Sequence, residues 1–227
     1  MGQVIPRSAA PETIMEHVDQ TLEIARARGE VFKAPAEARL AATHAAVQQV
    51  EASLTTALGA AATAHTKLLA ADRDSDLTVG AVLDECWNAL GRPAQSVEFS
   101  LVAGAGKASW TDGDPSVQHQ FMQVLAGNFR RSTAELLQAR KEEWAKRIED
   151  KAAVQQAAAA EVSTADATVF GVQAQLRGLA NLAQVCLGRL KRDYKNQGLT
   201  ETQIHEIIPD YEPKPRAKPT PPAAPPA

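Results

Sequence analysis

Apolar side chains recur in this chain at intervals of three, four and seven residues, over stretches longer than an ordinary helix. One such stripe runs from Leu40 to Leu68, and a heptad pattern runs from Val172 to Leu190. Only an α-helix places residues at these intervals on one face, and the heptads are typical of a coiled coil. Aromatic residues make up only 4% of the chain, which favours close packing through small side chains. The predicted fold class is therefore all-α, an elongated four-helix-type bundle built from long helices.

Composition divides the chain into three predicted parts. We expect a disordered N-terminus over residues 1–9, a helical bundle over 10–208 and a proline-rich flexible tail over 209–227. Eight of the thirteen prolines follow Ile208, which favours an extended segment with polyproline II character. The tail lacks apolar side chains with which to pack a core.

Within the bundle, helix boundaries are predicted from breaks in the apolar pattern. The first stripe weakens at Gly29 and resumes at Pro35, which either kinks one long helix or begins a second. The polar stretch 72–76 predicts a break that caps a short helix. A later helix is predicted to begin at Asp114-Pro115 and to run to about Glu161, with a weak interruption at 163–166 before the heptads. Two further signals lie near the end: Gly198 predicts a helix stop, and the stretch 200–203 predicts a capping box.

The period of the pattern changes from about four to two between Val97 and Trp110. Val97, Phe99 and Leu101 alternate with polar residues, and a turn at 103–106 would place Phe99 opposite Trp110 on one face. The sequence therefore predicts one small β-hairpin near residues 97–110. Since a lone hairpin is marginal in water, its apolar face should lie on this protein's own helices or on a partner.

The two halves of the chain resemble each other at an offset of 107 residues. This offset places residues 14–49 over 121–156, with Met15 over Met122 and the sequence Ala-Ala-Val-Gln-Gln at 45–49 over the same five residues at 152–156. A true duplication would give each half a long helix, a turn and a shorter helix, with the hairpin as the crossover. The high alanine content leaves coincidence as the alternative.

No motif for catalysis or for metal binding is complete. Gly104-Ala105-Gly106-Lys107 lacks the first glycine and the Ser or Thr of a phosphate loop. Asp72, Asp74 and Asp76 have the spacing that opens a calcium loop, but leucines stand where that loop needs Gly and Glu. The five histidines form no HExxH or ExxH pair, and no GxSxG sequence occurs. We therefore predict no catalytic residue, no cofactor and no metal site.

Charge and hydropathy restrict the classes of partner. A formal net charge of −3 provides no field that would attract nucleic acid. No run reaches the roughly 18 apolar residues that span a bilayer, so we expect no stable membrane insertion. Cys86 and Cys186 lie among apolar helical neighbours, which indicates small buried residues and a reducing, cytoplasmic location. No small-molecule substrate can be identified.

These observations favour a non-catalytic structural or adaptor protein that binds a protein partner or associates with itself. The predicted interaction residues are Phe99, Leu101 and Trp110 on the hairpin, and Pro219 and Pro222 in the tail, which would suit a groove lined with aromatic side chains. One alternative is a membrane-active bundle that inserts the 97–110 hairpin as a tongue. Another is an enzyme whose scattered residues a single sequence does not identify.

Overall fold

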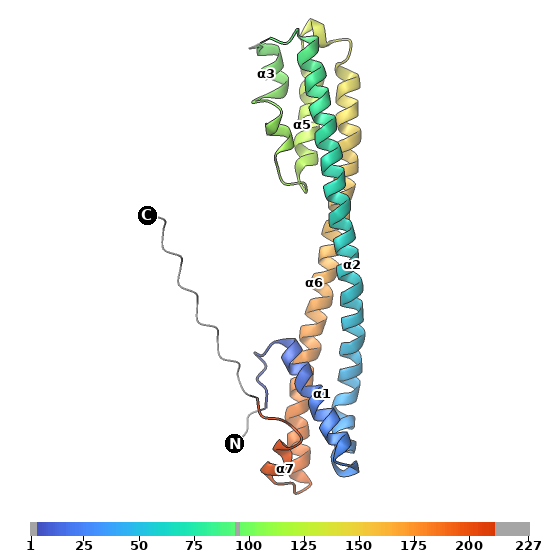
Figure 1. Cartoon of the computed structure of the whole chain (residues 1–227), viewed down its shortest axis with the longest axis vertical. Coiled ribbons are helices and arrows are strands. Elements are labelled where there is room, and N and C mark those ends of the chain that lie inside the picture. Colours follow the sequence, from blue (N-terminus) through green and yellow to red (C-terminus); the bar gives the residue numbers. More distant parts are fainter. Residues whose placement is uncertain (1–3, 94–95, 212–227) are drawn as a thin grey trace, which may run out of the picture. The chain divides into compact units, whose positions relative to one another are not determined.

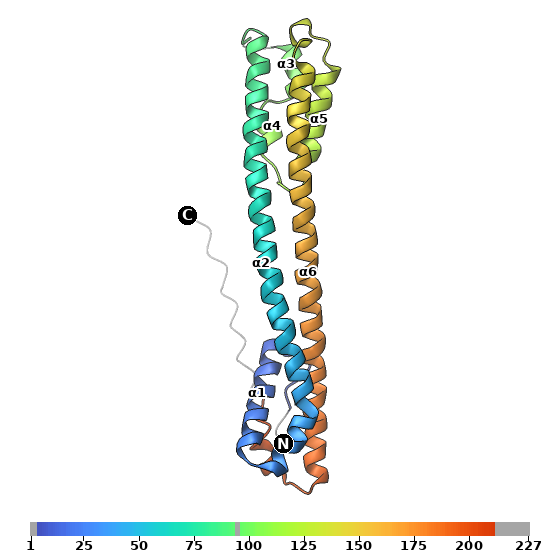
Figure 2. The ribbon, with the colours of Figure 1, turned by 90° about the vertical axis from the view of Figure 1, so that its right-hand side faces the viewer.

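The computed structural model describes residues 4–93 and 96–211, and it is predominantly helical (Figures 1 and 2). No strand occurs within these two described ranges. The all-α prediction is therefore confirmed. The elements, in chain order, are α1 (Pro11–Ala27), α2 (Glu30–Ala89), α3 (Val97–Ala103), α4 (Ala108–Thr111), α5 (Gln118–Arg131), the 3₁₀ helix η1 (Glu135–Leu137), α6 (Lys141–Asn196) and α7 (Glu201–His205).

The chain divides into two compact units. Unit 1 consists of Met1–Ala52 and Gln173–Ala227, and unit 2 consists of Ser53–Val172. Each of the long helices α2 and α6 contributes one segment to each unit. The predicted tail falls within unit 1, and residues 212–227, which include Pro219 and Pro222, lie outside the described residues.

In unit 1, α1 packs its apolar face against the two long helices. Its buried face carries Val18 and Leu22 at the helical spacing of four. The hydroxyl of the fully buried Tyr194 on α6 donates to the carbonyl of Phe32 on α2, at 2.7 Å. Residues 4–9 are the described part of the predicted disordered segment, and among them Ile5 is buried and its carbonyl accepts from Gln184 Nε2 at 3.0 Å.

In unit 2, α5 and the short helices α3 and α4 pack beside α2 and α6. The centre of the core is Trp144 on α6, whose ring lies 5.6 Å from that of Phe129 on α5, and both side chains are fully buried. Aromatic pairs of this kind add to the stabilisation from burial. The other large core residues are Val79, Val82, Leu83, Val102, Met122, Leu125, Leu137 and Ile148.

The polar stretch 72–76 does not break α2, which corrects the prediction. The amide of Gln155 on α6 donates to Asp72 at 2.8 Å, and the amide of Gln118 on α5 donates to Asp76 at 2.5 Å. Both glutamines are buried. The side chains that interrupt the apolar stripe are thus the acceptors of a buried polar layer, which joins α2 to α5 and α6.

The remaining boundary predictions succeed or fail for local reasons. Gly29 ends the first helical segment with φ 98°, and α2 begins at Glu30, so Pro35 neither begins this helix nor separates two helices.

The helix predicted from Asp114 to Glu161 is wrong, because a break between α5 and α6 divides it. At its start, Asp114 Oδ1 instead accepts from the amide of Ser116 and closes a turn. The predicted interruption at 163–166 lies inside α6. The stop at Gly198 and the capping box at Thr200 are confirmed.

The predicted hairpin at 97–110 is wrong, since this segment forms α3 and α4. The Ser96 side chain caps α3 by accepting from the amide of Phe99 at 3.1 Å. Alternation of apolar residues over so short a stretch fits a strand, but the helical pair Val97 and Leu101 fits a helix equally well. Val102 and Ala103, on the opposite face, are buried. Packing of this helical face against the core therefore determined the conformation of the segment, and the alternation of apolar residues in its sequence did not.

The helix bounds agree with an internal repeat. Pro11 and Gln118 begin the first helix of each half, 107 positions apart, and Ala89 and Asn196 end the two long helices, also 107 positions apart. Each unit also contains an arginine–carboxylate pair between α2 and α6: Arg39 with Asp193 at 2.6 Å in unit 1, and Arg147 with Glu85 at 2.8 Å in unit 2. Arg147 follows Arg39 by 108 positions, and Asp193 follows Glu85 by 108 positions. The helix bounds keep an offset of 107 and the ion pairs an offset of 108, so no single insertion relates the two halves, and the duplication stays a prediction.

Candidate functional site: an apolar groove beside α3

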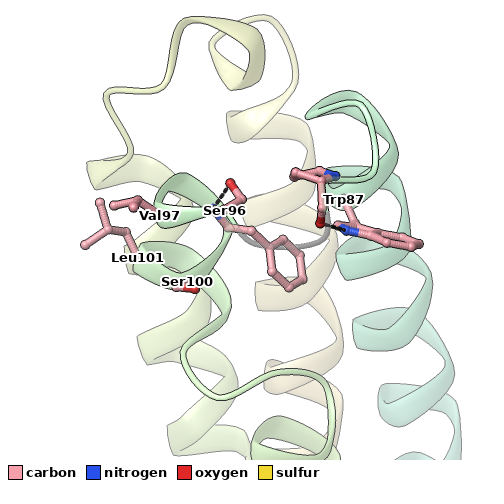
Figure 3. Close-up of a pocket in the computed structure, with 7 residues that line it drawn as sticks. Trp87, Ser96, Val97, Ser100 and Leu101 are labelled. Atoms are coloured by element: carbon pink, nitrogen blue, oxygen red, sulfur yellow. Dashed lines mark hydrogen bonds between the residues drawn. The ribbon is translucent and has the colours of Figure 1, made fainter.

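A groove of about 850 Å³ lies in unit 2 between the end of α2 and α3 (Figure 3). We call it the α3 groove. The α2 side and the chain that follows it contribute Trp87 and Pro93, and the cap and outer face of α3 contribute the rest. The lining residues are Trp87, Pro93, Ser96, Val97, Phe99, Ser100 and Leu101.

The groove and its surroundings expose large apolar side chains. Val97 is 73% exposed and Leu101 is 74% exposed, and their spacing of four places them on one face of α3. Trp87 on α2 is 40% exposed. Leu136, which lines an adjoining hollow of about 370 Å³, is 66% exposed. This hollow shares Pro93 and Ser96 with the α3 groove, so the two are continuous.

Hydrogen bonds to the backbone hold α3 in place. Asn128 Nδ2 on α5 donates to the carbonyl of Val102 at 3.1 Å, and Trp110 Nε1 on α4 donates to the carbonyl of Ala103 at 2.6 Å. On the other wall, Trp87 Nε1 donates to the carbonyl of Pro93 at 3.2 Å (Figure 3). This hydrogen bond restrains the indole ring of Trp87.

Carboxylates line the hollows beside the apolar wall. Glu98 lines two neighbouring hollows, and Glu135 lines the one that contains Leu136. The amide of Glu98 itself and the hydroxyl of Ser96 donate hydrogen bonds that hold the pKa of the Glu98 carboxyl below its usual value, so it is ionised at neutral pH. Arg131 lines the hollow on the far side of α3, where its guanidinium donates to Asn128 Oδ1 at 2.7 Å.

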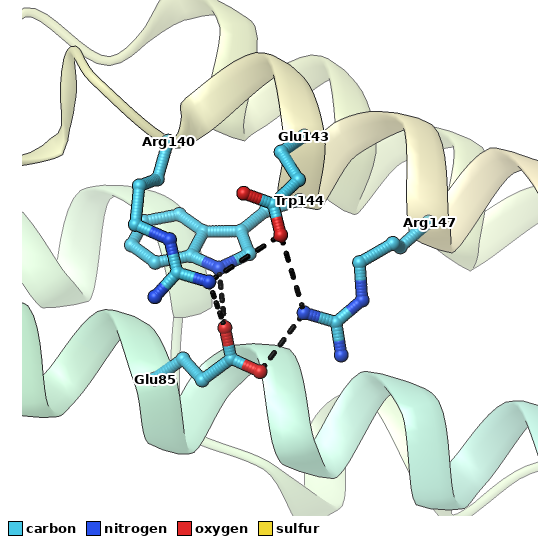
Figure 4. A network of polar contacts seen from close by, with 5 residues as sticks. All are labelled: Glu85, Arg140, Glu143, Trp144 and Arg147. Atoms are coloured by element: carbon cyan, nitrogen blue, oxygen red, sulfur yellow. Dashed lines mark hydrogen bonds and ion pairs between the residues drawn. The ribbon is translucent and has the colours of Figure 1, made fainter.

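A network of charged side chains supports the end of α2 that bears Trp87 (Figure 4). The carboxylate of Glu85 accepts from Arg140 Nη2 at 2.6 Å, from Arg147 Nη1 at 2.8 Å and from Trp144 Nε1 at 2.9 Å. These donors, Arg147 first and Trp144 second, lower the pKa of Glu85. The carboxylate is fully engaged with its donors, so the network joins α2 to α6 and is not a general acid or base.

The shifted carboxylate of Asp72 also has a structural explanation. Burial raises its pKa first, followed by the nearby negative charges of Asp76 and Asp114, while the bond from Gln155 opposes the rise. This cluster belongs to the buried polar layer and does not line the α3 groove. In the part of the chain that the structure describes, no group of three or more His, Cys, Asp or Glu residues could hold a metal ion.

Comparison with known proteins leaves the site to be interpreted from its own chemistry. We found no protein-family model, curated protein or solved structure that matches this chain at a significant level. Among the described helices, none combines the length and the hydropathy needed to cross a membrane. The described lining of the groove contains the hydroxyl groups of Ser96 and Ser100 and no histidine or cysteine, and the Ser96 hydroxyl donates to the carboxylate of Glu98 at 2.9 Å. Its surface is suited to binding an apolar segment.

The structure brings together two of the five predicted interaction residues. Phe99 and Leu101 line the α3 groove, whereas Trp110 does not line it and packs against the core of unit 2. The prediction that Phe99 and Trp110 share the face of a hairpin is therefore wrong, although both contact the same core. Sequence reasoning missed Trp87 and Leu136. For Trp87, the signal in the sequence that indicates an exposed position is its place near the end of the helix, before Gly91.

Proposed function

We propose that this chain is a non-catalytic adaptor that binds a protein segment through the α3 groove. The observation that supports this proposal is the exposure of Val97 and Leu101, at 73% and 74%, on one face of a helix that adjoins an exposed tryptophan. Apolar patches of this kind on a soluble protein are typical of interaction sites. Tryptophan is also the residue type most enriched among those that dominate binding energy.

The tongue alternative loses its structural basis, because it required a hairpin and the segment is helical. The adaptor proposal also loses the hairpin face that was its first candidate surface. The candidate surface is now the exposed face of α3 that carries Val97 and Leu101, in place of the predicted hairpin face with Phe99 and Trp110. The opposite face of α3, with Val102 and Ala103, is already used by the core.

The test compares two charge substitutions at equally exposed apolar positions of unit 2. Leu101→Glu places a carboxylate at the groove, and Phe170→Glu does the same on α6 at a residue that is 68% exposed and does not line the groove. Each chain is tagged, expressed in its native cells and isolated with its bound proteins. We expect one or more proteins to be recovered near 1:1 with the wild-type and Phe170→Glu chains and to be lost with Leu101→Glu. Equal recovery with all three chains would refute the groove as the interaction site.

A further inference from the structure

We infer that the α3 groove binds a basic proline-rich segment in the polyproline II conformation, and that this segment is residues 213–222 of a second copy of this chain. The inference rests on the proposed function, since it names the occupant of the same groove. Three features support it: the aromatic lining of the groove, the carboxylates beside it, and the sequence of the segment, Pro-Lys-Pro-Arg-Ala-Lys-Pro-Thr-Pro-Pro.

The aromatic lining suits proline rings. Grooves that recognise polyproline II segments are walled by aromatic side chains, because a proline ring is flat and apolar and its bound conformation costs little entropy. Trp87 and Phe99 supply two aromatic rings, and Pro93 lies between the elements that carry them. The indole nitrogen of Trp87 already donates to the carbonyl of Pro93, so the ring is held in position before a ligand arrives.

The carboxylates suit the basic residues of the segment. Glu98 and Glu135 line the hollow that is continuous with the groove. No ion pair of either carboxylate occurs among the described residues, and Glu98 accepts from its own amide and from the hydroxyl of Ser96. Arg131, which is four residues before Glu135 and lines the neighbouring hollow with Glu98, donates to Asn128 Oδ1 at 2.7 Å, and Arg92 donates to Asn88 Oδ1 at 2.6 Å. An arginine or lysine that enters this hollow would form charge-assisted bonds with a carboxylate.

The sequence of the segment combines basic residues with prolines along one edge of a polyproline II helix. A polyproline II helix has three residues per turn, so Arg216, Pro219 and Pro222 lie along one edge. At 3.1 Å per residue this edge is about 19 Å long. It carries a guanidinium at one end and two proline rings at the other, as required by carboxylates beside an aromatic groove.

The segment follows Tyr211, the last described residue, whose ring lies 6.0 Å from that of His17. The segment and the groove that it enters are assigned to different copies, so the contact forms between two chains. A tail of one copy in the groove of another is a heterologous contact, so the mean mass of the assembly should rise with concentration.

Two variants with complementary defects test the inference. The first, Trp87→Ala, disables the groove and keeps the tail. The second, with Lys214, Arg216 and Lys218 all changed to Glu, disables the tail and keeps the groove. Sedimentation velocity is measured on each full-length chain from about 1 µM to about 1 mM, the range in which contacts of this size associate. We expect the wild type to associate, with its dissociation constant weakened at least tenfold in either variant alone.

A 1:1 mixture of the two variants should regain association but stop at a 1:1 dimer, because only the tail of the first fits the groove of the second. Leu101→Glu repeats the groove defect at a fully surface position, which guards against a folding effect of Trp87→Ala. Phe170→Ala, at an exposed residue outside the groove, should associate like the wild type. A synthetic peptide of residues 212–227 should dissociate the wild-type assembly.

Three outcomes would overturn the inference: a wild-type chain that stays monomeric at about 1 mM, equal association of Trp87→Ala and wild type, or a mixture that remains monomeric. These outcomes are separate from failure of the proposed function. If the wild type stays monomeric while Leu101→Glu still loses a captured protein, the groove is an interaction site and only its occupant is wrong. If Leu101→Glu loses nothing in either assay, both proposals fail.

Discussion

Replacement of Glu85 should destabilise unit 2 more than its partial exposure suggests. Glu85→Ala removes the only acceptor of Trp144 Nε1 among the described contacts, and Trp144 is fully buried. A buried donor without an acceptor costs about 1–3 kcal/mol. Loss of the ion pairs with Arg140 and Arg147, whose side chains are 46% and 35% exposed, adds about 0.5–1 kcal/mol after allowance for solvent. The expected loss is about 1.5–4 kcal/mol in the free energy of unfolding.

The assay is equilibrium urea denaturation followed by tryptophan fluorescence. The chain has three tryptophans, Trp87, Trp110 and Trp144, and all of them lie in unit 2, so the signal reports this unit. Glu85→Gln should lose only about 1 kcal/mol, since its amide oxygen can still accept from the indole. The matched control is Glu143→Ala. The Glu143 side chain is 56% exposed and its contacts with the same arginines are 3.4 and 4.0 Å, so a loss below about 0.5 kcal/mol is expected.

The same comparison predicts a pH dependence. The pKa of Glu85 is lower in the folded chain than its usual value of 4.5. Its contribution to stability is therefore complete above that value and is lost as pH falls toward the folded pKa. The difference between wild type and Glu85→Ala should be constant from pH 6 to 8, values well above 4.5, and should shrink below about pH 4.5. A loss no larger than that of Glu143→Ala, or a difference that persists unchanged at the lowest pH of native folding, would refute the reasoning.

Three further predictions concern the tail, Trp110 and Cys86. Ending the chain at Tyr211 should leave the melting temperature unchanged at about 1 µM, because the tail lacks apolar residues to pack on its own fold and association between copies is negligible there; calorimetry checks this. Trp110→Ala should lose about 2–4 kcal/mol in urea denaturation, because the ring packs against the core of unit 2, whereas Trp87→Ala should lose less and impair association instead. Burial raises the pKa of the Cys86 thiol to about 11, so iodoacetamide should modify it at neutral pH only on unfolding, and rapid labelling of the native chain, seen by mass spectrometry of its peptide, would contradict the buried position.

The long helices could be predicted from the sequence because their apolar residues keep one period over many turns. The same reasoning failed at 72–76, where polar residues were interpreted as a helix end. Asp72 and Asp76 remain inside α2 because Gln155 and Gln118, distant in sequence, supply buried donors for them. A polar residue within an apolar stripe is therefore consistent with two structures. It can mark the end of a helix, or it can form a hydrogen bond to a buried side chain of another helix. One sequence does not distinguish these structures unless the partner is also identified.

The candidate site could be predicted only in part, for a related reason. The segment from Val97 to Ala103 has apolar residues on both sides of a helix, and both a hairpin and a helix can bury about half of them. The buried face of α3 is determined by contact with α5, whose Asn128 donates a hydrogen bond from Nδ2 to the carbonyl of Val102. Once Val102 and Ala103 enter the core, Val97 and Leu101 must face outward, since no helix can bury both sides against one neighbour. The exposed apolar face is thus a consequence of how α3 packs on α5. A partner that covered Val97 and Leu101 would remove the free-energy cost of their exposure to water.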